Sequence, residues 1–191
     1  MKLLLQNSLV LVLICVIGPG SLHAQFSRYG GGLSFSTGID KLEPDRIETG
    51  NPGLTVRGIY DLNKKMFLIP GLSFYMPKKI GHQGSTLKTY YTHLDVHMGY
   101  KLAHEGPIMF YGLAGPDLTG LYLSYNTDDP NFQSKFIPSP GLSVGTGVEM
   151  IIDNSFNAFT QVRYIVGKYQ QLIISIGAHY YFAGRRYKSW R

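Results

Sequence analysis

Polar and apolar side chains alternate through residues 92–102 (THLDVHMGYKL), and this alternation restricts the segment to one kind of structure. The polar positions are followed one by one by apolar ones: His93, Asp95, His97 and Lys101 alternate with Leu94, Val96, Met98, Tyr100 and Leu102. Successive side chains of a β-strand point to opposite faces. The segment therefore predicts a strand with one ionisable face and one apolar face.

Similar strand-like segments recur along the chain, and almost no helical periodicity follows residue 25. Turn-rich stretches separate the segments. The predicted strands are residues 28–36, 54–62, 67–76, 89–102, 108–125, 141–152, 157–166 and 172–182. The pattern predicts an all-β fold, an eight-stranded antiparallel up-and-down β-barrel.

The predicted connections alternate in length. Residues 37–53, 77–88 and 126–138 form long connections, whereas 63–65, 103–107 and 153–155 form short ones. The connection at 167–171 is the exception, because it is shorter than the other connections expected at the same end of the barrel. Alternate connections of a meander emerge at opposite ends, so one end carries long loops. Bacterial outer-membrane barrels show this asymmetry, which predicts a transmembrane barrel.

The composition of the two faces favours a barrel with its polar face inside. That face is rich in glycine and serine, which suit the narrow interior of an eight-stranded barrel. Charged residues make up only 16% of the chain, against roughly a quarter in soluble domains. The residues predicted to face the membrane are Leu94, Val96, Met98, Val144, Val148, Ile174 and Ile176. A soluble, calycin-like carrier of a hydrophobic ligand is the alternative, and it requires the apolar face inside.

Aromatic residues cluster near the predicted strand ends, as in the girdles of membrane barrels. They are Tyr60, Tyr75, Tyr90, Tyr91, Tyr100, Tyr125, Tyr164, Tyr180 and Phe182. Ordinary strand propensity is the alternative explanation.

The N-terminus has the features of a signal peptide. Lys2 precedes an apolar run at 9–17, which is too short for a membrane-spanning helix of about 20 residues. A small residue, Ala24, permits cleavage before Gln25. We expect a signal peptide at 1–24, the barrel at 25–182 and a periplasmic tail at 183–191. The single cysteine, Cys15, lies in the removed segment, so the mature chain has no disulfide.

Ionisable residues on the polar face predict a network inside the barrel, because buried charges are costly unless they are paired. Its predicted members are Arg57, His93, Asp95, His97, Lys101, Glu149, Arg163 and His179. We expect the two arginines to pair with the two carboxylates, and the histidines to bridge. A zinc site at His93, Asp95 and His97 is the alternative. Strand residues i and i+4 lie about 13 Å apart, so such a site would need ligands from a neighbouring strand.

An enzyme that modifies lipid A remains an alternative function, since such an enzyme needs a nucleophile with a base. Ser85 with His82, and Ser175 with His179, are the candidate pairs, and neither has an orienting acid in the sequence. We therefore predict a non-enzymatic protein with no cofactor and no metal.

The long loops are the predicted interaction surface. Lys78, Lys79 and Lys88 are predicted to contact phosphates of the outer leaflet. The net charge of +6 comes from scattered lysines and arginines, so nucleic acid is not an expected partner.

Three segments, PGLSVGTGVEM (140–150), NAFTQVRYIVG (157–167) and GAHYYF (177–182), carry a resemblance to a known family. The chain resembles the outer-membrane β-barrel domain family common in Bacteroidota, the PorT-like group. The resemblance implies a location in the outer membrane more firmly than an activity. The expected partners are outer-membrane lipid, lipopolysaccharide and the barrel assembly machinery, and we expect the protein to be a monomer. Many barrels end at a terminal aromatic residue, whereas here AGRRYKSWR follows Phe182.

Overall fold

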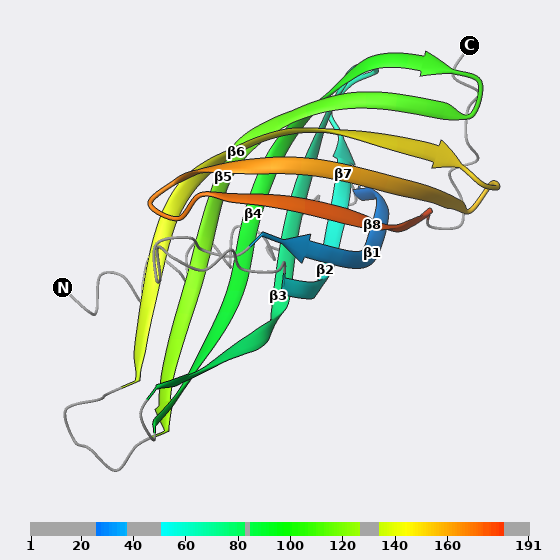
Figure 1. Cartoon of the computed structure of the whole chain (residues 1–191). Helices are drawn as coiled ribbons and strands as arrows, with labels where there is room; N and C mark the ends of the chain where they lie inside the picture. Colours follow the sequence, from blue (N-terminus) through cyan, green and yellow to red (C-terminus); the bar gives the residue numbers. More distant parts are fainter. Residues whose placement is uncertain (1–25, 38–50, 83–84, 127–133, 182–191) are drawn as a thin grey trace, which may run out of the picture.

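The computed structural model describes residues 26–37, 51–82, 85–126 and 134–181. Its eight strands form a closed barrel in chain order, and β8 pairs back with β1 (Figure 1). Every neighbouring pair is antiparallel. The strands are β1 Phe26–Ser36, β2 Asn51–Asp61, β3 Met66–His82, β4 Ser85–Glu105, β5 Ile108–Asn126, β6 Lys135–Ile151, β7 Phe156–Gly167 and β8 Gln171–Tyr181. The predicted eight-stranded barrel is therefore confirmed.

The predicted signal peptide and C-terminal tail lie outside the described residues. Within the described ranges, no helix has the length and apolar character needed to cross a membrane.

The barrel has its polar face inside. Leu94 is 53% exposed, whereas the neighbouring Asp95 is 4% exposed, and the same alternation runs through β7 and β8. The calycin-like alternative is wrong, because it requires the apolar set inside.

Strand β3 is the strand whose faces the sequence leaves least clear. The structure turns Phe67, Ile69 and Tyr75 inward. Phe67 lies opposite Gly99 of β4, and its ring occupies the space that a side chain at Gly99 would need. Glycines on the inner face thus make room for large side chains, and the interior is filled.

Two apolar clusters occupy the interior. The rim cluster, toward the end with the long connections, consists of Tyr75, Tyr91, Leu121, Leu123, Ile165, Tyr169 and Ile173. The basal cluster, toward the short-turn end, consists of Ile59, Phe67, Ile69, Met109, Tyr111 and Leu113. Tyr75 and Tyr91 are buried in the rim cluster, so they are not part of an outer aromatic girdle.

The predicted long loop at 77–88 is wrong, because most of it is strand. β3 continues to His82 and β4 begins at Ser85, and the two pair in register as far as His82 and Ser85. β2 pairs with β3 only up to Tyr75, and β7 pairs with β6 only from Gly141 onward. Four strands therefore project past the rest of the barrel (Figure 1). We call this projection the hairpin lobe; it comprises residues 76–82, 85–90, 122–126 and 135–140.

Prolines mark both free edges of the hairpin lobe. Pro138 and Pro140 lie on β6 where β7 no longer pairs with it, and Pro77 lies on β3 beyond its last pair with β2. A bulge shifts the register of β3 between Tyr75 and Lys78. Proline cannot donate to a ladder and is typical of sheet edges.

Side-chain caps form two of the tight turns at the opposite end. The Asn63 carboxamide oxygen accepts from the backbone N–H groups of Lys65 and Met66, both at 2.8 Å. The Asp153 carboxylate accepts in the same way from Ser155 and Phe156, at 2.6 and 2.8 Å. These turns follow from short polar residues that hydrogen-bond the backbone two and three positions on.

Candidate functional site

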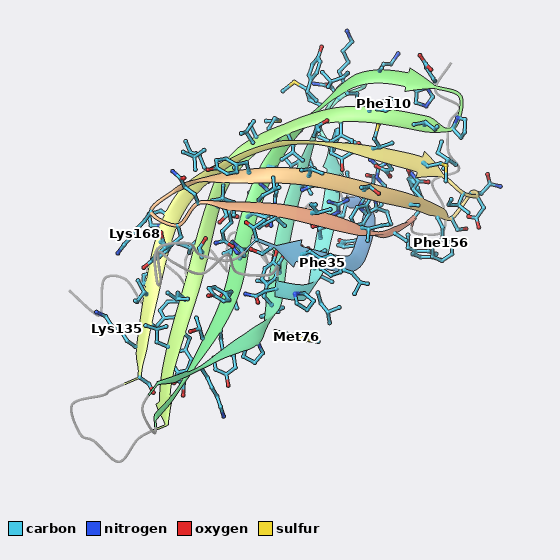
Figure 2. All side chains as sticks on the ribbon, in the orientation of Figure 1. Phe35, Met76, Phe110, Lys135, Phe156 and Lys168 are labelled. Carbon is cyan, nitrogen blue, oxygen red and sulfur yellow. The ribbon has the colours of Figure 1, made fainter. Side chains whose placement is uncertain are left out.

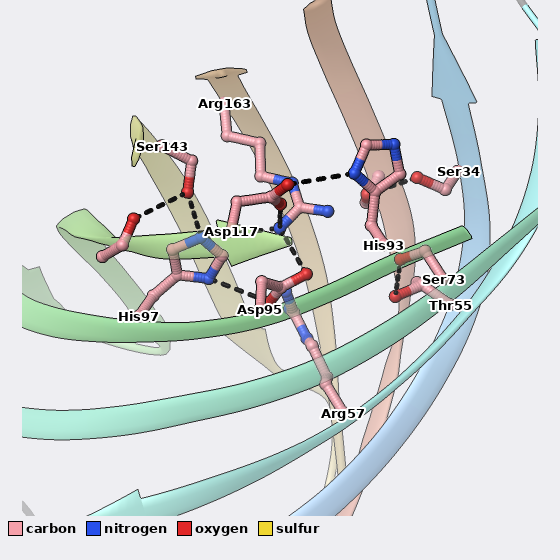
Figure 3. A network of polar contacts seen from close by, with 12 residues as sticks. Ser34, Thr55, Arg57, Ser73, His93, Asp95, His97, Asp117, Ser143 and Arg163 are labelled. Atoms are coloured by element: carbon pink, nitrogen blue, oxygen red, sulfur yellow. Dashed lines mark hydrogen bonds and ion pairs between the residues drawn. The ribbon is translucent and has the colours of Figure 1, made fainter. Parts of the chain in front are cut away.

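The centre of the barrel interior is a cluster of charged and polar side chains from β4, β5, β6 and β7 (Figure 3). Arg163 Nη1 on β7 donates to Asp95 Oδ2 on β4 at 2.6 Å and lies 3.9 Å from Asp117 Oδ2 on β5. Each of these side chains is at most 5% exposed. One arginine thus balances two carboxylates across the interior.

Two histidines flank this central cluster. His93 Nδ1 lies 3.1 Å from Asp117 Oδ1, and His97 Nδ1 lies 3.1 Å from Asp95 Oδ1. His97 Nε2 also hydrogen-bonds the Ser143 hydroxyl on β6. The structure thus directs His93 and His97 to different carboxylates. No group of three or more His, Cys, Asp or Glu residues that could hold a metal ion occurs in the described part of the chain.

Asp95, His97 and Ser143 have the connectivity of an acid, a base and a nucleophile. Ser143 and His97 are 2% and 0% exposed, and Arg163 Nη1 lies 3.5 Å from His97 Nε2. The rim cluster, whose members are at most 7% exposed, lies between this layer and the lobe end. The chain therefore has triad-like contacts in a place that the rim cluster closes off from that end.

A second ion cluster lies toward the short-turn end, centred on Glu149. Glu149 Oε1 accepts from Asn157 Nδ2 at 2.7 Å and lies 3.4 Å from Arg28 Nη1 and 3.2 Å from His179 Nδ1. Arg28 Nη1 also donates to the Tyr181 hydroxyl. Arg28, absent from the predicted network, is the arginine that pairs with Glu149.

Arg57 connects this second cluster to the barrel wall without a carboxylate of its own. Its Nε donates to His179 Nε2 at 2.9 Å, its Nη1 donates to the Gln161 carboxamide, and its guanidinium lies 3.3 Å from the centre of the Phe159 ring. Because His179 Nε2 accepts, Nδ1 carries the proton donated to Glu149. The expected direct pairing of Arg57 with a carboxylate is therefore wrong, whereas Arg163 has one.

All eight residues of the predicted network point inward, and Lys101 is only half-buried, with its ammonium 5.9 Å from the Phe67 ring centre. The sequence prediction omitted other members. They are Arg28, Asp117, Ser143, Asn157 and Gln161. Each of them points to the same face of the sheet as a predicted member on its own strand or on a neighbouring strand. Following every second residue to both ends of each strand would therefore have identified them.

Several buried polar atoms of the network lack a hydrogen-bond partner within the described protein, among them Arg57 Nη2, His93 Nε2 and Arg163 Nε. A cavity of about 10 Å³ lies beside Arg28 and Glu149, which is room for about one water molecule. Buried polar groups are normally satisfied, so we expect ordered water inside the barrel.

The two Ser–His pairs considered for catalysis do not form such pairs in the structure. Ser175 Oγ hydrogen-bonds Ser34 Oγ at 2.9 Å, whereas both ring nitrogens of His179 are engaged by Glu149 and Arg57. His82 and Ser85 are register partners at the end of the β3–β4 hairpin, and their side chains lie outside the described part.

Outward-facing aromatic residues lie in two bands, one toward each end of the barrel, and Figure 2 labels Phe35 of one band and Phe110 and Phe156 of the other. The band near the short turns contains Phe26, Tyr29, Tyr60, Tyr100, Phe110, Phe156 and Tyr180. The band near the lobe contains Phe35, Phe74, Tyr90, Tyr122, Phe136 and Tyr164. On β4, Tyr90 and Tyr100 are ten positions apart, which at a rise of about 3.3 Å and a tilt of about 45° corresponds to roughly 23 Å.

The outer surface between the two bands is apolar. Among the described strand residues, none of the outward side chains between the bands is charged. The predicted membrane-facing residues all point outward there: Leu94, Val96, Met98, Val144, Ile174 and Ile176 are exposed and Val148 is half-buried. Girdles about 25 Å apart around an apolar surface are typical of membrane barrels.

The three lysines expected at the outer leaflet lie on the hairpin lobe. Lys88 is half-buried, two positions beyond Tyr90, and Lys79 is its register partner on β3. Lys78 pairs with Thr89. The side chains of Lys78 and Lys79 lie outside the described part.

Solved barrels share this architecture at low sequence identity. Neisserial surface protein A superimposes with a TM-score of 0.59 and 16% identity over 81% of this chain and 96% of its own. Ail, the attachment invasion locus protein of Yersinia pestis, gives 0.58 and 15% over 81% and 97%. The outer membrane protein OprG from Pseudomonas aeruginosa gives 0.55 and 14% over 81% and 94%.

These likenesses establish the fold alone. No curated protein sequence matches the chain significantly. The model of the outer membrane protein beta-barrel domain family matches residues 8–182, and so nearly the whole chain. The protein therefore belongs to the outer membrane protein beta-barrel domain family and is located in the outer membrane.

Proposed function

We propose that this barrel is a non-enzymatic surface protein whose hairpin lobe projects from the cell and makes contacts outside it. The observation that carries the proposal is the extension of β3, β4, β5 and β6 beyond the other four strands. Long extracellular ends and short periplasmic turns are the rule in this class of barrel. The short-turn end, with both ends of the described barrel, then faces the periplasm after removal of the signal peptide.

The filled interior supports a role at the surface. The rim cluster is buried at the base of the lobe, and the two ion clusters below it contain direct contacts between strands that are not neighbours. An eight-stranded barrel filled in this way leaves no wide pore. The hairpin lobe is the part of the structure that extends beyond a simple eight-stranded barrel, and we propose that it is the functional surface.

Lipopolysaccharide is the contact that we propose for the base of the lobe. Lys79 and Lys88 are directly opposed on neighbouring strands, an arrangement that destabilises a strand pair when both charges are alike. A phosphate group bound between them would remove that cost. Both lie just beyond the aromatic band that contains Tyr90, the depth at which outer-leaflet phosphates lie.

A polyanion is also the ligand of one structural neighbour. Ail of Yersinia pestis has been solved in complex with the heparin analogue sucrose octasulfate, at 16% identity to this chain. The likeness extends to the fold only, so the compound serves here as a competitor in the experiment.

Removing the lobe tests the proposed function. Tyr75 pairs with Tyr91, and Leu121 pairs with Ile137, so Asn-Gly turns in place of 77–89 and 123–135 would shorten both hairpins at matched positions. We expect the shortened protein to insert and to keep the shifted gel migration of an unboiled barrel, and to lose binding to lipopolysaccharide. Unchanged binding would exclude the lobe as the contact surface.

Charge removal tests the anchor more finely. Lys78→Gln, Lys79→Gln and Lys88→Gln together should reduce the lipopolysaccharide that co-purifies with the protein, and sucrose octasulfate should compete for the remainder. Lys64→Gln with Lys65→Gln is the control, because these exposed lysines lie in the β2–β3 turn at the other end. Equal retention by both variants would contradict the anchor.

The remaining expectations belong to the same proposal. They are the narrower likeness to the PorT-like group, insertion by the barrel assembly machinery and a monomeric state. The alternative of a lipid A-modifying enzyme is not favoured, because Ser175 and His179 are held by other partners and Ser143 and His97 are buried.

A further inference from the structure

The outer face of the barrel carries an apolar groove of about 340 Å³ across β1, β2, β3 and β4. Its outward-facing lining residues are Phe26, Tyr29, Val56, Pro70, Leu72 and Leu94. The groove extends from the aromatic band near the short turns, where Phe26 and Tyr29 lie, to Leu94 in the apolar zone. It is therefore a hollow in the part of the surface that faces hydrocarbon.

The groove has a backbone cause. Gly58 faces outward without a side chain, and a Cβ there would lie 2.7 Å from the Phe26 ring. Opposite it on β3, Pro70 has no N–H, and β2 and β3 have no register pair between Arg57–Gly71 and Tyr60–Leu68. The Phe26 ring therefore covers Gly58, and the wall is lowered beside that ring, where β2 and β3 lack ladder pairing.

The floor of the groove is the wall of the barrel. Arg57, which forms part of the lining, points inward, as do Ile59 and Ile69 beside it, and the three are 6%, 1% and 1% exposed. Its occupant must therefore come from the outside. At this depth the surroundings contain no water to fill a hollow, and an empty one would lose dispersion contacts along its lining. The occupant with matching chemistry is a hydrocarbon chain.

A second feature indicates which kind of lipid the hydrocarbon chain belongs to. The turn that joins the same two strands contains Lys64 and Lys65, both exposed. Tyr60, in the aromatic band near the short turns, and Lys64 are four positions apart, which corresponds to about 13 Å along the strand and roughly 9 Å along the barrel axis. The headgroup region on each side of the hydrocarbon core is about 5–8 Å thick. The lysines therefore lie at the outer edge of the headgroup region, where their long side chains can reach a phosphate.

We propose that β2 and β3 form a binding site for one anionic phospholipid of the leaflet at the short-turn end. An acyl chain lies in the groove beside the Phe26 ring, along Val56, Leu72 and Leu94, and the phosphate is held by Lys64 and Lys65. The assignment of that leaflet to the periplasmic side follows from the proposed orientation. The site itself is independent of the hairpin lobe and its partner.

Quenching by brominated lipids tests the site in the full-length mature chain. Trp190, the single tryptophan, is replaced by Phe, and a reporter is introduced as Leu94→Trp in the groove or Val144→Trp on β6. The two positions are matched, at 53% and 54% exposed. Phosphatidylcholine vesicles then receive phosphatidylglycerol or phosphatidylethanolamine with brominated chains, and gel migration of unboiled protein confirms the fold.

We expect phosphatidylglycerol to quench the groove reporter with a relative affinity about fivefold above that of phosphatidylethanolamine, and the β6 reporter to show no preference. Lys64→Gln with Lys65→Gln should abolish the preference, whereas the lobe variant Lys78→Gln, Lys79→Gln and Lys88→Gln should keep it. Equal quenching at both reporters would overturn the proposal. So would disulfide-linked dimers of Val56→Cys in vesicles, which would assign the groove to a second copy of the chain. Unchanged lipopolysaccharide binding by the lobe variant, with the phosphatidylglycerol preference intact, would refute only the proposed role of the lobe.

Discussion

Arg163 on β7 and Asp95 on β4 form an ion pair across the barrel, with 2.6 Å between Nη1 and Oδ2. The two strands are not neighbours in the sheet, so the pair connects opposite walls where no backbone hydrogen bond can. Both side chains are at most 5% exposed. Removing one partner of such a buried pair lowers the free energy of unfolding far more than replacing both partners with apolar residues.

Asp95→Leu should therefore destabilise the barrel by about 3–5 kcal/mol, because Arg163 would keep a buried charge with Asp117 as its nearest remaining carboxylate at 3.9 Å. Denaturant unfolding in lipid vesicles measures the change. The double variant Asp95→Leu with Arg163→Leu should be more stable than Asp95→Leu alone. A strictly additive pair of effects would contradict a direct interaction.

Val144→Arg should destabilise the barrel by about 2–4 kcal/mol, because it places a charge on the apolar outer surface between the aromatic bands. Leu102→Arg is the matched control. Leu102 also points outward, but it lies two positions beyond Tyr100 at the short-turn end, where the cost should be about 0–1 kcal/mol. Unfolding in vesicles of both variants measures the difference. Equal costs would argue against the membrane boundary drawn at Tyr100.

Ser143 should not react with a fluorophosphonate probe in the native protein, although it hydrogen-bonds His97. Its 2% exposure prevents the attack that the triad-like connectivity would otherwise permit. Mass spectrometry of the treated protein provides the measurement, with Ser143→Ala as the control. Stoichiometric labelling at Ser143 would revive the enzyme alternative.

The protein should show no stable open-channel conductance in planar bilayers. The rim cluster and the central ion cluster fill successive layers of the interior, and side chains fill a barrel of this size. Single-channel recording at neutral pH tests this. Long-lived, uniform openings of the wild-type protein would show that these layers rearrange.

The strand count, strand directions and inside face could be predicted because a period of two is explicit in segments such as 92–102. The lobe could not be predicted in the same way. Pro77, Lys78, Lys79 and Gly81 have the composition of a loop. Lys78, Lys79 and Gly81 become strand through pairing with β4, which depends on the tertiary fold.

Pairing partners inside the barrel were harder to predict than membership of the interior. Parity places Arg57 and Glu149 inside, but which residues meet across the interior depends on the stagger of the strands. That stagger brings Glu149 to Arg28, and Arg57 to His179. Arg28 is the first residue of the first predicted strand. Because it lies close to the predicted signal peptide, it was not included in the predicted network.

Pro77, Pro138 and Pro140 have a consequence for how densely this protein can be packed. Four strands that extend beyond a barrel ordinarily have two unpaired edges. A neighbouring molecule could add a strand to either edge, and crowded copies could then associate edge to edge. Rings without an amide hydrogen interrupt that continuation at both borders. The prolines thus limit growth of the sheet from one molecule to the next, even where molecules are crowded.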